Sequence, residues 1–232
     1  MNAAWKARLH KLWRSWVAPF LVIVIVTSAL RSSVADWNDV PSASMLPSIL
    51  IGDRIFVNKL AYDLKVPFTP WRIAEWGSPQ RGDIVVFYSP LDGTRLVKRV
   101  VGLPGDTIEL ADNRLIINGK ALDYQKDRPN VVTRSDNGKE HHGFSAIEEL
   151  GTHTHTIFVT QGVGSLRTFK PIVVEPGKYF MMGDNRDNSA DSRYFGPVAK
   201  KLIVGQATAV VVSVDHERHY APRWQRFFTS LP

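Results

Sequence analysis

The chain has 232 residues, a formal net charge of +7 at pH 7 and no cysteine. This length allows one membrane anchor and one domain with its own hydrophobic core, and the lack of cysteine excludes disulfides, a cysteine nucleophile and zinc-thiolate sites. A net positive charge is typical of proteins that bind nucleic acid or an anionic membrane surface. The apolar segment near the amino end favours the membrane as the partner.

The first predicted element is a transmembrane helix near the amino end. Residues 1–16 combine four basic residues with three tryptophans, whereas residues 17–30 carry no charge. The basic residues predict a cytoplasmic amino end and an extracytoplasmic remainder. The fourteen uncharged residues rise only about 21 Å as a helix, short of a hydrocarbon core of about 30 Å. We therefore expect the span to include Ser15, Trp16 and Arg31.

A cleavable signal peptide is the alternative interpretation of this segment. Ser33 and Ala35 place small residues at the two positions that such a cleavage needs. We expect retention instead, because a loop of candidate catalytic serines starts only a few residues later. Residues 1–35 are then the cytoplasmic end and the anchor, and residues 36–232 are one extracytoplasmic domain.

That loop, residues 41–48, has the sequence Pro-Ser-Ala-Ser-Met-Leu-Pro-Ser. Its two prolines favour a stiff, extended backbone that presents the hydroxyls of Ser42, Ser44 and Ser48. A serine becomes a nucleophile only when a base removes its proton, and residues 11–140 contain no histidine. The base must come from another residue type or from further along the chain.

Beyond this loop the sequence predicts strands. Asn118-Gly119 is a strong signal for a two-residue turn between strands. The long apolar run at residues 198–214 is rich in β-branched residues and interrupted by polar ones, which favours a buried strand over a second membrane helix. The predicted strands lie in residues 49–60, 83–88, 108–110, 115–117 and 198–214. The expected fold is mostly β, an antiparallel β-sheet domain preceded by one amino-terminal transmembrane helix.

A lysine in a further strand-like run is the candidate base. Alternation places Lys98 on one face with Leu96 and Val100 and leaves its arginine neighbours on the other face. Burial among apolar side chains disfavours the charged amine, by about 1.4 kcal/mol for each unit of lowered pKa. A neutral Lys98 could accept the proton of Ser44. The alternative is a lysine that extends from a strand edge into water; Arg99 is interpreted as structural.

Two aromatic segments each allow two interpretations. Residues 67–76 contain four large apolar residues between prolines: Phe68, Trp71, Ile73 and Trp76. These side chains belong either to the hydrophobic core or to a surface that lies in the lipid interface. The tail at residues 223–228 mixes cations with aromatics and either contacts the bilayer or is a frayed end.

Histidines gather around a polar segment at residues 123–152. A His-x-His pair on a strand turns both rings to one side, so His153 and His155 with His141 and His142 could in principle hold zinc. No carboxylate or thiol stands at regular ligand spacing. We therefore expect solvated histidines and no metal.

The last motif is the segment at residues 183–193, which is rich in acidic and basic side chains. Its charged residues could pair among themselves. A calcium loop is excluded because Arg186 and Arg193 interrupt the carboxylates and the terminal bidentate glutamate is missing.

Four of these segments together resemble motifs of bacterial type I signal peptidases, in the family's order and after a membrane segment. The resemblance extends to about Val214, and it implies an uncleaved anchor in the bacterial inner (plasma) membrane. It also implies a serine endopeptidase without cofactor and a variable β insertion at about residues 123–175. The matching segments are residues 41–48, 81–87, 98–106 and 183–193.

The resemblance implies roles for individual residues. Ser44 is the nucleophile of an acyl-enzyme mechanism with Lys98 as general base, and the Ser42 hydroxyl and the Ser44 amide form the oxyanion hole. Ser189 orients the lysine amine, and a supporting ion pair joins Asp191 to Arg193. The sequence departs from the commonest family pattern by Ala43 in place of glycine and Ser48 in place of threonine, which is compatible with a negative φ at Ala43.

The expected partners are exported preproteins and the lipid bilayer, without nucleic acid or metal. We expect strand addition of the substrate and cleavage after Ala-x-Ala. Two other classes remain open: a self-cleaving serine-lysine repressor, which needs a DNA-binding domain, and a non-enzymatic membrane-tethered β domain. Cleavage of a signal-bearing precursor separates the three.

Overall fold

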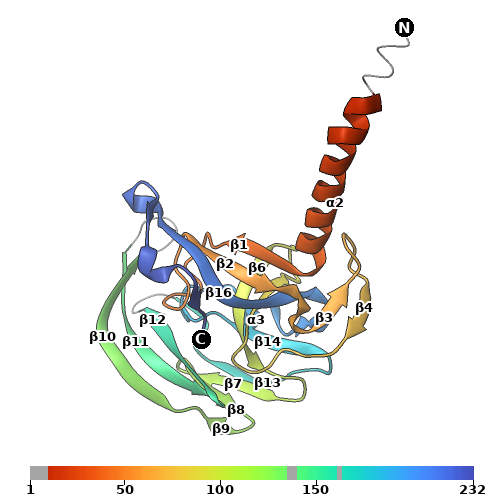
Figure 1. Cartoon of the computed structure of the whole chain (residues 1–232). Helices are drawn as coiled ribbons and strands as arrows, with labels where there is room; N and C mark the ends of the chain where they lie inside the picture. The colour runs from red at the N-terminus through yellow and green to blue at the C-terminus, as the bar shows by residue number, and fades with distance from the viewer. Residues whose placement is uncertain (1–9, 135–139, 161–163) are drawn as a thin grey trace.

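The structure, a computed structural model, describes residues 10–134, 140–160 and 164–232. A helix occupies residues His10–Ser33; it contains a π-helical turn, η1 (Trp13–Val17), followed by α2 (Ala18–Ser33). Its 24 residues rise about 36 Å, enough to cross a hydrocarbon core of about 30 Å. The helix extends past both ends of the uncharged run and includes Trp16 and Arg31, as expected. It projects from a β domain (Figure 1).

The β domain is built on one large antiparallel sheet whose central strands carry the candidate site. The order is β1-β2-β16-β5-β6-β14-β15, with β17 and β18 paired to β16. The strands are β1 (Ala35–Asp39), β2 (Asp53–Asn58), β5 (Ile84–Tyr88), β6 (Arg95–Gly102), β14 (Lys178–Met182), β15 (Val198–Ala199), β16 (Ile203–Asp215), β17 (Ala221–Pro222) and β18 (Thr229–Ser230). The long apolar run near the carboxyl end is therefore strand, as predicted, and the mostly antiparallel β fold is confirmed.

Three smaller sheets complete the domain. The strands predicted at residues 108–110 and 115–117 are present as β7 paired with β8, and Asn118 and Gly119 turn the chain into β9 with φ of 53° and 78°. The sheets are β10 (Tyr124–Arg134), β11 (Glu140–Leu150) and β12 (His153–Thr160); β13 (Phe169–Val173), β7 (Thr107–Ala111), β8 (Arg114–Ile117) and β9 (Lys120–Ala121); and β3 (Asp63–Lys65) with β4 (Arg72–Glu75). The short helices are η2 (Lys59–Ala61), α3 (Ser192–Phe195), η3 (Lys200–Leu202), η4 (His216–Arg218) and η5 (Trp224–Arg226).

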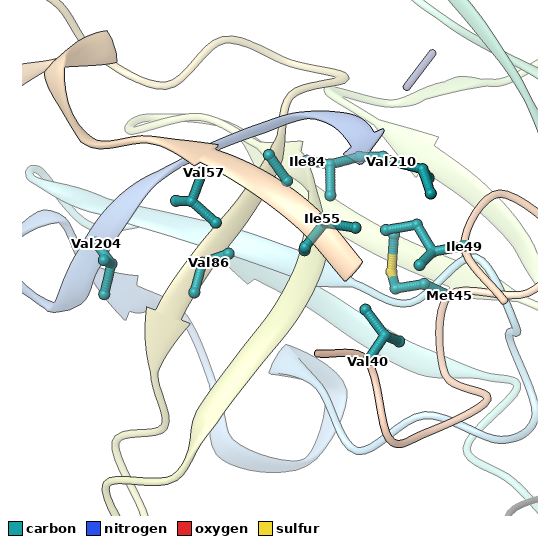
Figure 2. Close-up of a cluster of buried hydrophobic side chains, with 10 residues drawn as sticks. Val40, Met45, Ile49, Ile55, Val57, Ile84, Val86, Val204 and Val210 are labelled. Carbon is teal, nitrogen blue, oxygen red and sulfur yellow. The ribbon is translucent and has the colours of Figure 1, made fainter. Parts of the chain in front are cut away.

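The serine loop is packed into a hydrophobic core. Met45 and Ile49 lie beside Ile55 of β2 in Figure 2, and all three side chains are buried. The alternation of β2 turns Ile55 and Val57 to this side. Full burial of one such side chain stabilises the fold by about 1.5–3 kcal/mol. Val40, which precedes the loop, belongs to the same core, so the core holds the chain on both sides of Ser44.

The aromatic segment at residues 67–76 is not core. Phe68, Trp71, Ile73 and Trp76 are each more than half exposed. They belong to the β3–β4 hairpin, which pairs with no strand of the large sheet in the described chain. The core interpretation of these residues is wrong, and contact with lipid stays a prediction.

Candidate active site

The structure brings Ser44 and Lys98 together. The Lys98 Nζ atom lies 2.6 Å from the Ser44 Oγ atom and also donates to the Val97 carbonyl at 2.9 Å. Only 2% of Lys98 is exposed, while Ser44 stays partly accessible. The burial expected for Lys98 is therefore present, and its amine is within hydrogen-bond distance of a hydroxyl that a substrate can reach.

The backbone around Ser44 is fixed by one asparagine. Asn185 donates from its backbone amide to the Ser44 carbonyl at 3.1 Å and from its side chain to the Ala43 carbonyl at 3.0 Å. The φ of Ala43 is negative, so alanine is tolerated there without strain. The Ser42 Oγ atom lies 3.4 Å from the Ser44 Oγ atom. The loop thus presents two hydroxyls on one side from a pinned backbone.

The segment from Gly183 to Arg193 lies against this loop. A Cβ atom on Gly183 would lie 2.5 Å from the Ser44 carbonyl oxygen and 2.3 Å from the Ser189 Oγ atom, so only glycine fits between them. Ser189 donates its hydroxyl proton to Asp191 at 2.7 Å, which leaves the Ser189 oxygen free to accept from an amine. Ser189 therefore lies close to the Ser44 backbone, and its role toward the Lys98 amine stays a prediction.

The predicted pair of Asp191 and Arg193 is present and completely buried. Two guanidinium nitrogens of Arg193 donate to the two carboxylate oxygens at 2.8 and 2.9 Å. Burial raises the pKa of Asp191, but the hydrogen bonds and charge of Arg193 outweigh it and hold that pKa below its usual value. The charged carboxylate also accepts from the Gly183 amide at 3.0 Å. This ion pair therefore fixes both Gly183 and Ser189.

The other charges of this segment pair outside it. The alternative in which they pair among themselves is wrong for Asp184, which binds Arg99 in a bidentate arrangement at 2.7 and 2.9 Å. Arg186 binds Glu148, and Asp187 binds Arg167. The partners of these charged residues thus come from β6, from β11 and from the chain just before β13.

Arg99 is as buried as Lys98, although the two side chains leave opposite faces of β6. This is possible because both faces of the sheet are covered at this point. Burial raises the pKa of Asp184, but the charge and hydrogen bonds of Arg99 lower it by more. The pKa is therefore below its usual value, and the carboxylate stays ionised. The charge of this carboxylate balances the positive charge of the buried Arg99. Ser48 also donates to Asp184, at 2.5 Å, and so ties the end of the serine loop to the pair.

One histidine departs from the expectation of solvated rings. His155 is 4% exposed, with Nε2 at 3.4 Å from Glu148 and 3.8 Å from Asp184, and neither ring nitrogen forms a hydrogen bond to a described residue. Burial lowers the pKa of His155 to about 4, so its ring is neutral at pH 7. The alternation of β12, which puts His155 on the same face as Ile157, could have revealed this from sequence.

The other histidines do not assemble a metal site in the described structure. His142 and His153 are exposed, as expected, and the side chain of His141 lies outside what the structure describes. Among the described residues, no group of three potential ligands is placed to hold a metal ion.

Comparisons with known proteins agree on one family. A family model described as signal peptidase, peptidase S26, matches residues 13–212. Signal peptidase I of Pseudomonas fluorescens is 38% identical over 84% of this chain and 70% of its own length, and that of Pseudomonas aeruginosa is 37% identical over the same shares. A crystal structure of a signal peptidase I from Enterococcus faecalis is 34% identical and covers 57% of this chain and 98% of its own, with a TM-score of 0.35.

The family model covers most of the chain, and both relatives exceed 30% identity over more than two thirds of their length. Peptidase S26 is a family of serine endopeptidases, in agreement with a buried amine beside a loop serine. The chain belongs to the signal peptidase family, peptidase S26.

Proposed function

We propose that the chain removes signal peptides from exported preproteins, with Ser44 as nucleophile and Lys98 as general base. The observation that carries this proposal is the 2.6 Å contact between the Lys98 amine, almost fully buried, and the Ser44 hydroxyl. Burial favours the neutral amine, which accepts the Ser44 proton as Oγ attacks the scissile carbonyl. The protonated amine then gives that proton to the leaving nitrogen. Water hydrolyses the Ser44 ester and releases the signal peptide.

The oxyanion of each tetrahedral intermediate needs donors of its own. The Ser44 backbone amide and the Ser42 hydroxyl are the proposed donors, because both belong to the pinned loop and the Ser42 hydroxyl lies on the same side as the nucleophile. One such donor contributes about 3–4 kcal/mol to the transition state. Ser189, held by Asp191, orients the Lys98 amine in this proposal.

The substrate binds by strand addition beside β6. Strand β14 pairs with β6 only at Arg99, Val100 and Gly102, whereas β5 pairs along Arg95–Arg99. The stretch from Arg95 to Val97 thus has β5 on one edge and no second strand of the described sheet on the other, next to Lys98. An extended cleavage region can add its main-chain hydrogen bonds there. The preference proposed for this site is alanine at the first and third positions before the cut.

The membrane anchor is retained in this proposal and leaves the domain on the extracytoplasmic side of the inner membrane. The basic amino end predicts that orientation. The rival signal-peptide interpretation requires an accessible cleavage site, yet Ser33 is 5% exposed at the end of α2 and Ala35 already pairs in β1. The β3–β4 hairpin lies beside the base of the helix in Figure 1, and the exposed aromatics that it carries are suited to the lipid interface.

The test is cleavage of a signal-bearing precursor by the full chain in lipid vesicles, with the product identified by mass. Wild type is expected to cut after Ala-x-Ala, and Ser44→Ala to show no activity above background. Ser48→Ala is the matched control from the same loop and should stay within tenfold of wild type, because its hydroxyl serves Asp184. Cleavage by Ser44→Ala at the wild-type rate would overturn the proposal, and no cleavage by wild type would favour a non-enzymatic tethered domain.

A further inference from the structure

A buried lysine of the β domain binds the last turn of the membrane helix. Lys59, which follows β2, donates from Nζ to the carbonyls of Arg31 and Ser32 at 2.8 and 3.1 Å. The last four carbonyls of a helix have no partner within the helix, and a cation there also interacts favourably with the helix dipole. Lys59 is 9% exposed. A side chain of the β domain thus caps the carboxyl end of the helix.

A carboxylate holds this cap from the other side. Asp36 Oδ2 lies 3.4 Å from Lys59 Nζ, and Asp36 Oδ1 accepts from Arg31 Nε at 2.8 Å. Asp36 is 7% exposed, and although burial raises its pKa, Arg31 and Lys59 together lower it below its usual value. The carboxylate is therefore charged and links the helix end, the first strand and the domain.

Two backbone contacts make the same junction stiffer. The Lys59 amide donates to the Val34 carbonyl at 3.0 Å, and the Phe68 amide of the β3–β4 hairpin donates to the Ser32 hydroxyl at 2.8 Å. The helix end is therefore held by two separate segments of the domain.

No flexible linker separates the helix from the nucleophile. Strand β1 begins at Ala35, two residues after α2 ends, and pairs with β2 at every one of its positions. The next residue, Val40, exchanges backbone hydrogen bonds with Asp53 and Gly52. Ser44 follows within the pinned loop. A shift of the helix against the domain therefore requires the Lys59 cap to open.

We propose that Lys59 is a positioning residue that fixes the anchor helix against the β domain and thereby sets the height of Ser44 above the bilayer. The chain then selects precursors by the number of residues between their membrane-held segment and the scissile bond. Each extended residue of that spacer adds about 3.3 Å. This inference rests on the proposed function, because it concerns how the same site chooses among signal-bearing precursors.

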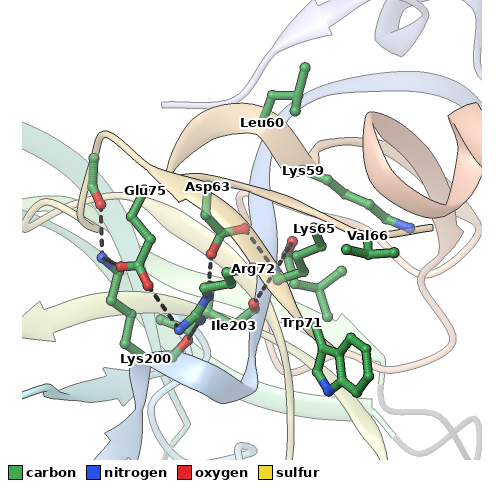
Figure 3. A network of polar contacts seen from close by, with 12 residues as sticks. Lys59, Leu60, Asp63, Lys65, Val66, Trp71, Arg72, Glu75, Lys200 and Ile203 are labelled. Carbon is green, nitrogen blue, oxygen red and sulfur yellow. Dashed lines mark hydrogen bonds and ion pairs between the residues drawn. The ribbon is translucent and has the colours of Figure 1, made fainter. Parts of the chain in front are cut away.

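A second lysine nearby provides a matched control. Lys65 of β3 is half-buried and, like Lys59, interacts with backbone carbonyls and an aspartate. Its partners, however, lie within the domain: Ile203, Val204 and Asp63. Figure 3 shows Lys65 in the network around Asp63 and Arg72, whereas the Lys59 amino group points away from that network. Lys65→Met removes comparable contacts without touching the helix.

The activity test uses precursors whose spacer is shortened by two residues or lengthened by up to six, with the full chain in vesicles. We expect wild type, Lys65→Met and Lys59→Arg to cleave the precursor lengthened by four residues, about 13 Å of strand, at least tenfold more slowly than the best one. In Lys59→Met this ratio should fall below threefold. All four proteins should cleave a soluble peptide without a membrane segment within twofold of one another.

A spectroscopic test measures the junction without activity. Spin labels on Val26→Cys in α2 and Lys120→Cys in β9 label a chain that has no other cysteine. We expect one narrow distance distribution for wild type and Lys65→Met, and at least twice that width for Lys59→Met. Lys59→Gln replaces Lys59→Met if the latter does not fold.

The outcomes separate this inference from the proposed function. A steep spacer dependence in Lys59→Met, a flat one in wild type, or an unchanged distance distribution in Lys59→Met overturns the role of Lys59. Failure of wild type to cleave the soluble peptide and the precursors overturns the proposed function, while the distance distributions still decide whether Lys59 holds the helix.

Discussion

The neutral, buried His155 predicts a specific loss of stability in weak acid. Its pKa is about 4 in the folded chain, against 6.5 for an ordinary histidine, because burial disfavours the charged ring. The unfolded chain therefore binds more protons between these two values, and the free energy of unfolding falls as the pH drops through this window. Above pH 6.5 the contribution is constant, and below about pH 4 the loss is complete.

The size of the effect follows from the two pKa values. At pH 5 the ring is almost fully protonated in the unfolded chain and about one tenth protonated in the folded one. Lowering the pH from 7.5 to 5 should then reduce the free energy of unfolding by about 2 kcal/mol. The pKa values of Glu148 and Asp184 are lowered in the folded chain, so the stability that they contribute is lost only in stronger acid.

The assay is urea unfolding of the full chain in detergent, followed by tryptophan fluorescence at pH 7.5 and 5. A loss of about 2 kcal/mol corresponds to a midpoint lower by about 1 M. His155→Gln should lose less than about 0.5 kcal/mol over the same range, because glutamine does not titrate. His153→Gln, which changes an exposed histidine of the same strand, should behave as wild type. Equal losses in wild type and His155→Gln would refute the reasoning.

Three further predictions concern the serine loop and its support. Ser42→Ala should lower kcat for a soluble peptide by about 10²–10³ with little change in KM, and Ser42→Thr should keep most activity; an unchanged rate would place the second oxyanion donor elsewhere. Gly183→Ala should lower the urea midpoint by an amount equivalent to about 1–3 kcal/mol, because its Cβ would overlap the Ser44 carbonyl and Ser189; wild-type stability would contradict that packing. Ser189→Ala should lower kcat without lowering the urea midpoint, and an unaltered kcat would remove its role toward Lys98.

Local patterns predicted the elements that depend on local chemistry. The alternation around Lys98 and the β-branched run before it predicted β6 and β5, and Asn118-Gly119 predicted a turn, because a left-handed backbone pair suits these two residues. The loop around Ser44 was also predictable from its prolines, but the expected extended backbone is wrong: the loop is a series of turns, in which the Leu46 amide donates to the Ala43 carbonyl at 3.1 Å. These features need little information from distant parts of the chain.

Features that depend on distant partners were not predictable. Arg99 is buried because a carboxylate 85 residues later reaches it, and nothing near Arg99 in sequence announces Asp184. The charges around Arg186 pair with other strands for the same reason, since short separations in sequence do not decide which buried charges meet. The exposed aromatics around Trp71 were ambiguous because core and lipid-facing segments share one composition.

The central claim is that Lys98 acts as the base for Ser44, and the cleavage rate of Lys98→Met on a soluble signal-peptide substrate tests it most directly. Methionine has a similar length and cannot accept a proton, and the urea midpoint of the variant verifies folding. The proposed mechanism predicts a loss of at least about 10⁴-fold with the urea midpoint retained. A folded Lys98→Met protein that cleaves within tenfold of wild type would contradict it.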